Sequence, residues 1–63
     1  MSYSKILKSY RQKHLLTQKE LAKLLGVSFA SVNRWENSKF EPTMRIKRKI
    51  RDLLKEDEIN YGK

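Results

Sequence analysis

The chain's strongest constraint on fold is a pair of short predicted helices joined by a tight turn, within residues 17–37. Thr17 and Glu20 have the spacing of a capping box, in which each side chain accepts a hydrogen bond from the other residue's backbone N–H. A helix is therefore predicted to begin at Gln18. Gly26 then supplies a left-handed residue, which ends a helix without a Cβ penalty.

The second helix of the pair is predicted to begin just after this turn, with Ser28 as its N-cap. Val32 and Trp35 lie three residues apart and form its inward edge, so we expect Trp35 in the core. Because so short a turn makes the two helices cross steeply at close range, the facing position needs a small side chain, and it holds Ala22. The first helix of the pair has an apolar stripe of Leu21, Ala22, Leu24 and Leu25.

The flanking segments predict two further helices. The first runs to about Lys13, and its apolar residues recur at i, i+3, i+4 and i+7: Tyr3, Ile6, Leu7 and Tyr10. The last follows Pro42, has Thr43 as N-cap, and runs from about Met44 to Lys55. Its apolar face is Ile46, Ile50, Leu53 and Leu54, and its other face is basic: Arg45, Lys47, Arg48, Lys49, Arg51 and Lys55. This pattern predicts an all-α chain.

Length and composition limit the chain to one small domain. Its 63 residues contain no cysteine, so helix packing must hold the fold without a disulfide or cysteine-based metal site. We expect a single domain over residues 1–63, with an ordered core of about 3–55 and a polar tail at 56–63. The chain is either a minimal domain or part of something longer.

The net charge of +8 is unevenly distributed. Residues 1–51 hold 13 Lys and Arg against 3 acids, whereas residues 52–63 hold 2 against 4. A small domain this basic is usually compensated by a polyanionic partner. We expect no membrane partner, because the apolar positions are used by the core and no apolar run approaches a membrane span. The N-terminus also lacks a secretory signal, so we expect a soluble cytoplasmic protein.

Spaced matches to a known family extend from about residue 3 to residue 54. They are Arg11, Leu16-Thr17-Gln18, Glu20-Leu21-Ala22, Leu25-Gly26-Val27-Ser28, Ser31-Val32, Arg34-Trp35-Glu36-Asn37 and Pro42-Thr43. On these residues the chain resembles the Cro and lambda-type repressor family of helix-turn-helix regulators, also called the xenobiotic-response-element family. The resemblance implies a compact four-helix domain of the lambda-repressor-like type, in which helices two and three form the helix-turn-helix.

Two positions depart from the family pattern. The family commonly has Gly or Asn where Leu15 stands, to end the first helix. Because a leucine at positive φ is strained, we expect this connection to adopt another shape. The family usually has glycine at the position of Ser38, so the path of that loop stays open.

The second helix of the pair carries the candidate base contacts. With Val32 and Trp35 inward, the residues that face outward or lie at the boundary are Phe29, Ala30, Asn33, Arg34 and Asn37. Arg34 carries a planar guanidinium group that can form two hydrogen bonds with guanine. The alternatives are a phosphate contact or a solvated charge. Asn33 has an amide that can hydrogen-bond to the edge of adenine, or it serves only as a spacer. Phe29 contacts a thymine methyl together with Ala30, or packs on the neighbouring helix.

The candidate phosphate contacts surround this helix. Gln18 and Lys19 lie at a helix N-terminus, where free N–H groups and the dipole attract phosphate. The resemblance implies that a glutamine at this position clamps the DNA backbone. Lys39 in the following loop is a second anchor. The expected set is Gln18, Lys19, Ser28, Asn37, Lys39 and Arg45.

Other residues are assigned to architecture. The resemblance implies that Arg11 and Glu36 form an ion pair between the first helix and the recognition helix. The expected structural set is Arg11, Ala22, Gly26, Trp35 and Glu36. His14 is the only histidine, so we expect a solvated residue or a phosphate neighbour. We expect no metal, no cofactor and no enzyme activity.

These observations predict sequence-specific binding of double-stranded DNA through the major groove. The resemblance implies a transcriptional regulator of the repressor type, which would be associated with the nucleoid. A free-standing repressor is expected to bind a two-fold site as a homodimer. The alternative is a DNA-targeting or protein-interaction module: an antitoxin, or a domain of a larger regulator or DNA-modifying protein.

Overall fold

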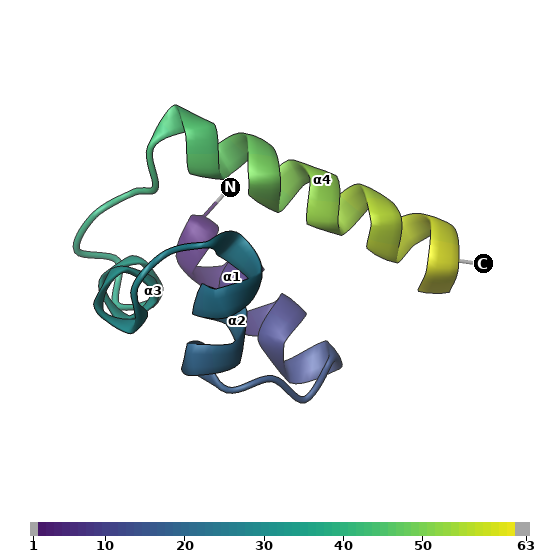
Figure 1. Ribbon diagram of the computed structural model, residues 1–63, viewed down its shortest axis with the longest axis horizontal. Coiled ribbons are helices and arrows are strands. Elements are labelled where there is room, and N and C mark those ends of the chain that lie inside the picture. The colour runs from purple at the N-terminus through teal and green to yellow at the C-terminus, as the bar shows by residue number, and fades with distance from the viewer. Residues whose placement is uncertain (1, 62–63) are drawn as a thin grey trace.

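The computed structural model describes the backbone of residues 2–61 and the side chains of residues 2–58. This part of the chain forms four helices and no strand: α1 (Tyr3–Lys13), α2 (Gln18–Leu25), α3 (Phe29–Glu36) and α4 (Met44–Tyr61). The helix-turn-helix of α2 and α3 packs on α1, and α4 lies along the other side of this group (Figure 1). The predicted all-α, four-helix architecture is confirmed.

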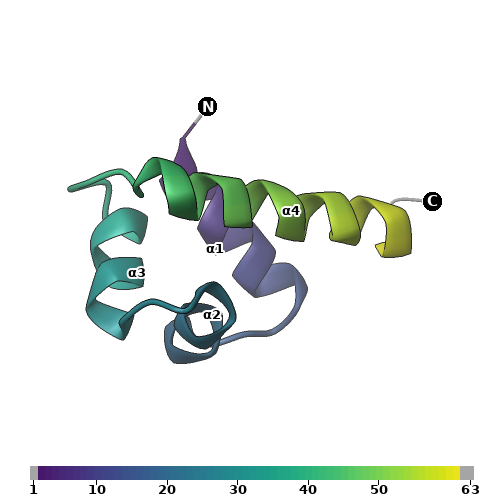
Figure 2. The ribbon, with the colours of Figure 1, turned by 45° about the horizontal axis from the view of Figure 1, so that its top comes forward.

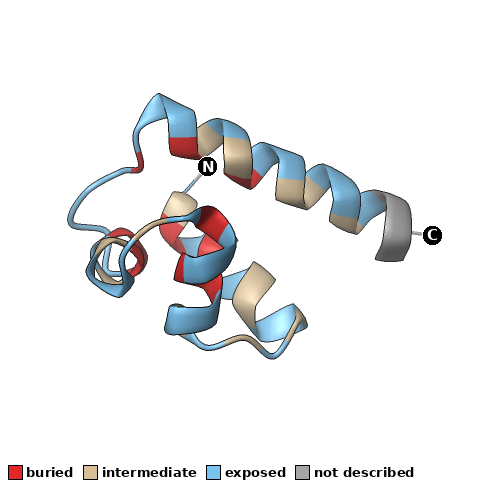
Figure 3. Ribbon diagram, viewed as in Figure 1, coloured by how far each residue is buried: buried red, intermediate tan, exposed pale blue. Residues whose placement is uncertain are grey.

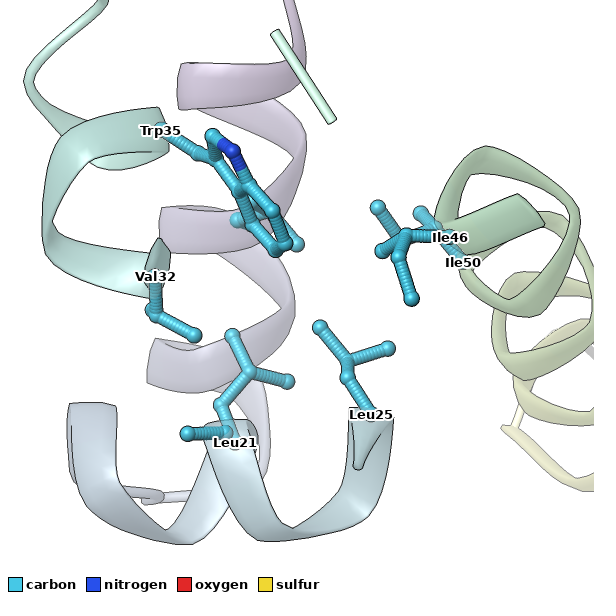
Figure 4. Close-up of a cluster of buried hydrophobic side chains, with 8 residues drawn as sticks. Leu21, Leu25, Val32, Trp35, Ile46 and Ile50 are labelled. Atoms are coloured by element: carbon cyan, nitrogen blue, oxygen red, sulfur yellow. The ribbon is translucent and has the colours of Figure 1, made fainter. Parts of the chain in front are cut away.

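The core lies where the apolar faces of the four helices meet. Figure 4 shows side chains of α2, α3 and α4 pointing into one shared interior. The buried apolar residues are Leu7, Leu21, Ala22, Leu25, Val32, Trp35, Ile46 and Ile50. Ala22 and Trp35 are buried as predicted, whereas Leu24, which belongs to the predicted apolar stripe of α2, is exposed. Leu24 lies on the flank of α2 that no other helix covers, so its apolar side chain by itself did not predict burial.

Local hydrogen bonds set the limits of the helix pair. The Thr17 hydroxyl accepts from the backbone N–H of Glu20 at 3.1 Å, and the Glu20 carboxylate accepts from the Thr17 N–H at 2.8 Å. The predicted capping box is therefore present. Gly26 has φ of 70° and ends α2, and the Ser28 hydroxyl accepts from the Ser31 N–H at 3.2 Å to begin α3.

Helices α1 and α3 end in the same way as α2, but without glycine. Leu15 has φ of 56° and Ser38 has φ of 61°, so both occupy the left-handed conformation that glycine adopts easily. After α1, the N–H of Leu16 donates to the carbonyl of Arg11 at 2.8 Å; after α3, the N–H of Lys39 donates to that of Arg34 at 3.1 Å. These are Schellman motifs. The expectation that Leu15 would avoid positive φ was wrong, because these hydrogen bonds outweigh the strain.

Helix α4 begins at Met44 as predicted, but it does not end at Lys55. It continues to Tyr61, so the predicted end at Lys55 was wrong and residues 56–61 are helical; residues 62 and 63 lie outside the described part. Asp57 explains part of the extension, because its carboxylate accepts from Lys13 Nζ at 2.8 Å and lies 2.6 Å from His14 Nε2. The prediction of a solvated His14 was also wrong, since the ring is held against α4.

None of the helices described is long and apolar enough to cross a membrane.

The strain at Leu15 gives a stability prediction. Its side chain is 89% exposed, so Leu15→Gly removes the strain of the left-handed conformation while losing little packing. We expect the free energy of unfolding to rise by about 1 kcal/mol, which in a domain of this size corresponds to a Tm increase of about 4–8 °C. Thermal unfolding followed by circular dichroism measures it. Leu15→Ala is the control, because it removes the same exposed side chain but keeps the Cβ; an equal increase in both variants would contradict the explanation.

Candidate nucleic-acid interface

The outer face of α3 points away from the other helices. Ala30, Asn33, Arg34 and Asn37 follow the i, i+3, i+4, i+7 spacing and share one side of the helix. Val32, Trp35 and Glu36 occupy the opposite side and are buried against the other helices (Figure 3). Ala30, Arg34 and Asn37 are exposed, and Asn33 is half-buried. The residues predicted to reach base edges therefore form one accessible stripe.

An aromatic side chain that the sequence analysis missed lies beside this stripe. The guanidinium carbon of Arg34 lies 5.8 Å from the ring centre of Phe40, within the range of a cation–π contact. Phe40 is 63% exposed and belongs to the loop between α3 and α4. Sequence spacing gave no signal for the contact, because Phe40 comes after α3 has ended.

Phe29 lies at the edge of the stripe. Its side chain is 47% exposed, so about half of its surface is covered and half is accessible. The Nδ2 group of Asn37 lies 3.4 Å from Oδ1 of Asn33, so these two amides contact each other along the stripe.

The predicted phosphate contacts lie on three different elements. Lys19 is exposed in the first turn of α2, Lys39 in the loop after α3, and Arg45 in the first turn of α4. Ser28 is exposed while its hydroxyl caps α3. Gln18 differs from these residues because it is half-buried and already has a partner. The predicted phosphate contacts thus come mostly from helix termini and the loop after α3.

Gln18 belongs to a hydrogen-bond network centred on Glu36. Arg11 donates from Nε to Oε2 of Glu36 at 2.8 Å and from Nη2 to Oε1 at 2.9 Å. The ion pair implied by the family resemblance is therefore present and bidentate. Gln18 Nε2 also donates to Oε1 at 3.0 Å, and the Ser4 hydroxyl donates to the backbone carbonyl of Glu36. Sequence reasoning found the Arg11 pair but missed that Gln18 joins it.

The network determines the ionisation of Glu36, which is only 2% exposed. Burial by itself raises the pKa of a carboxyl group, but the hydrogen bonds from Arg11 and Gln18 outweigh burial and hold the pKa of Glu36 below its usual value. The hydrogen bond between Arg11 and Glu36 also raises the pKa of Arg11. Both groups are charged at neutral pH. An amide carries two N–H groups, so the hydrogen bond to Glu36 uses one of those of Gln18 and fixes the position of its side chain.

Charge is arranged to leave the α3 region positive. The three carboxylates within residues 1–51 are already engaged: Glu20 caps α2, Glu36 binds Arg11, and Glu41 accepts from Lys47 Nζ at 2.9 Å. The remaining acids follow residue 51, in the half of α4 that extends away from α3 (Figure 2). The exposed cations Lys19, Arg34, Lys39 and Arg45 therefore lie in the part of the chain where each carboxylate already has a hydrogen-bond or ion-pair partner.

Comparisons with known proteins agree with this geometry. The profile of the helix-turn-helix family matches residues 7–58. The chain belongs to the helix-turn-helix family of the Cro and lambda-repressor type. It is also 46% identical over 44 residues to an uncharacterized HTH-type transcriptional regulator of Methanocaldococcus jannaschii, a match that covers 70% of this chain and 67% of the relative. No solved structure matches the chain.

The Glu36 network gives a pH-dependent stability prediction. We expect Glu36→Gln to lower the free energy of unfolding by about 2 kcal/mol at neutral pH, because Arg11 then faces a neutral amide. The pKa of Glu36 is lowered on folding, so its contribution is complete above the usual value of 4.5 and is lost as the pH falls through the folded-state value. The stability difference between wild type and variant should therefore shrink below about pH 4.5.

Urea unfolding between neutral and acidic pH measures this difference. Glu41→Gln is the matched control, because its carboxylate also has a lowered pKa but is exposed and pairs only with Lys47. We expect little change in that variant. A Glu36→Gln protein as stable as wild type at neutral pH would show that the network is not what joins the helices.

Proposed function

We propose that this protein binds double-stranded DNA sequence-specifically, with α3 in the major groove, and acts as a transcriptional regulator. The main support for this proposal is the accessible stripe on α3, the second helix of the helix-turn-helix. Its residues are Ala30, Asn33, Arg34 and Asn37. An α-helix fits the major groove, where each base pair presents a distinct pattern of donors and acceptors. Membership of the family and the regulator named among its relatives support the same function.

Within this proposal the side chains have two kinds of role. Arg34 donates to guanine, with Phe40 limiting the directions its guanidinium can take. Asn33 is placed to contact adenine, and Phe29 with Ala30 to contact a thymine methyl group. These contacts specify sequence.

Phosphate contacts fix the register of the domain on DNA. We assign them to Gln18, Lys19, Ser28, Asn37, Lys39 and Arg45. In this arrangement α2 crosses the DNA backbone with its N-terminus toward a phosphate. Repression follows if the bound site overlaps one used by the transcription machinery, and a DNA-bound protein of this kind is associated with the nucleoid.

Substitution of Arg34 and Lys39 separates the two roles. We expect Arg34→Ala to weaken binding to the preferred sequence by about 1–3 kcal/mol while changing binding to random duplex much less. We expect Lys39→Ala to weaken binding to both duplexes alike and to lower the salt slope by about one. The preferred sequence is first selected from a random duplex library, and fluorescence anisotropy at several salt concentrations then measures each affinity.

Arg48→Ala is the control for loss of charge alone. Arg48 is exposed on α4, outside the positions assigned to DNA, so we expect a smaller loss for it than for Lys39→Ala. Equal losses for Arg34→Ala and Lys39→Ala on both duplexes would refute the assignment of roles. Selection that yields no consensus at all would refute sequence-specific binding.

A further inference from the structure

A hollow of about 480 Å³ lies between the start of α1 and the loop that follows α3. Ser2 and Tyr3 line it from the start of α1, Trp35 from the end of α3, and Lys39 and Phe40 from the loop. Its volume is typical of small-molecule sites, which combine aromatic walls with a few placed polar groups. Because Trp35 belongs to the face of α3 opposite the exposed stripe, this wall of the hollow lies away from the surface proposed to read DNA.

The indole N–H of Trp35 is a donor that lacks an acceptor. The residue is only 8% exposed, yet its Nε1 makes no hydrogen bond within the described residues. Figure 4 shows this nitrogen on the edge of the ring turned away from Leu21 and Leu25. Since no fully enclosed side-chain nitrogen among residues 2–58 is left without a partner, Nε1 reaches the open space of the hollow that Trp35 lines. A largely buried donor of this kind is satisfied by an acceptor placed in the hollow.

The start of α1 brings further donors to the same hollow. The first backbone hydrogen bond of the helix runs from the Ile6 N–H to the Ser2 carbonyl at 3.1 Å, so the N–H groups of residues 3–5 have no partner within the helix. Ser2 is the N-cap, but its side chain makes no capping hydrogen bond, and the first turn contains no acidic residue. The positive end of the helix dipole is therefore not neutralised by residues of α1 itself.

The charged residues around the hollow favour an anion over a cation. Lys39 is exposed and lines the hollow, as does Glu41, the one carboxylate that does so within residues 2–58. That carboxylate already accepts from Lys47 Nζ at 2.9 Å, and the same Nζ lies 5.1 Å from the ring centre of Tyr3. A cation in the hollow therefore finds its possible partner engaged, whereas an anion finds unpaired donors and a lysine.

We propose that this hollow binds a small phosphorylated molecule, whose phosphate accepts hydrogen bonds from Trp35 Nε1 and from the start of α1 and pairs with Lys39. A phosphate suits the site because its oxygens accept from several donors at once, as they do at helix N-termini. A phosphate fills only part of the hollow, so the rest of the ligand lies against the rings of Tyr3 and Phe40. A DNA phosphate offers the same chemistry, but the position of Trp35 opposite the exposed stripe favours the small molecule.

Occupancy of the hollow lowers the affinity for DNA, a consequence that rests on the proposed function. Lys39 is assigned both to the ligand and to a DNA phosphate, so binding to one draws it from the other. Phe40 lines the hollow and also lies beside Arg34, with 5.8 Å between the guanidinium carbon and the ring centre. The coupling is reciprocal, so DNA lowers the affinity for the ligand by the same factor.

Nuclear magnetic resonance tests the site directly, because Trp35 is the only tryptophan of the chain and gives one indole N–H signal. Phenyl phosphate is the probe, benzyl alcohol the neutral control and benzylamine the cationic control, all at constant ionic strength. We expect phenyl phosphate to shift the indole signal and the backbone signals of residues 3–5 with one dissociation constant, and the controls to leave them unchanged. An indole signal unmoved by about 10 mM phenyl phosphate would overturn the proposal.

A matched pair of variants separates the site from general attraction to a basic protein. Ser2→Asp places a carboxylate at the start of α1, where it caps the helix and repels phosphate, so phenyl phosphate should bind about tenfold more weakly to a folded protein. Ser9→Asp makes the same charge change at an exposed position of α1 outside the hollow, and it should change the affinity by less than about twofold. Circular dichroism checks that both variants are folded. Equal losses in the two variants would overturn the site.

A DNA arm separates this inference from the proposed function. On the selected duplex, saturating phenyl phosphate should weaken binding by wild type about fivefold and leave binding by Ser2→Asp unchanged. If wild type binds no duplex while its indole signal still responds to phenyl phosphate, the proposed function fails and the site stands. If wild type binds the duplex while the indole signal responds to no phosphate probe, the site fails and the function stands. An indole signal that responds to the duplex alone would overturn the small-molecule ligand in favour of a DNA phosphate.

Discussion

The carboxylate of Glu36 joins three of the four helices through one set of hydrogen bonds. Arg11 reaches it from α1 and Gln18 reaches it from the start of α2, while Glu36 itself belongs to α3. A buried carboxylate is costly unless it is paired, and a domain of 63 residues has little apolar area to compensate. The bidentate pair therefore ties α3 to α1, and Glu36 lies on the face of α3 opposite the exposed stripe.

The ends of the helices are fixed by backbone hydrogen bonds more than by residue type. Gly26, Leu15 and Ser38 all adopt positive φ and close their helices with the same pattern, although only one of them is glycine. The closing hydrogen bonds and the packing of the helices that follow outweigh a local strain of about 1–2 kcal/mol. The three helix ends therefore share one backbone geometry, but glycine adopts the left-handed conformation with less strain than leucine or serine does.

Charge is distributed unevenly between the two ends of the molecule. The basic residues near α3 are left without nearby free carboxylates, because Glu20, Glu36 and Glu41 serve as cap or ion-pair partners. The acids that follow residue 51 lie in the distal half of α4 (Figure 2). This asymmetry favours a polyanionic partner at the basic part of the domain and not at the distal half of α4.

The sequence by itself determined the helix pair, because the capping box at Thr17, the glycine at position 26 and the spacing of Val32 and Trp35 act between near neighbours. It also located the outward stripe of α3, since helical periodicity alone places those side chains opposite the core. Only the tertiary structure decided the contacts between residues far apart in the chain. The Gln18 bond to Glu36, the length of α4 with Asp57 held by Lys13 and His14, and the position of Phe40 beside Arg34 depend on how the helices pack, which no local spacing encodes.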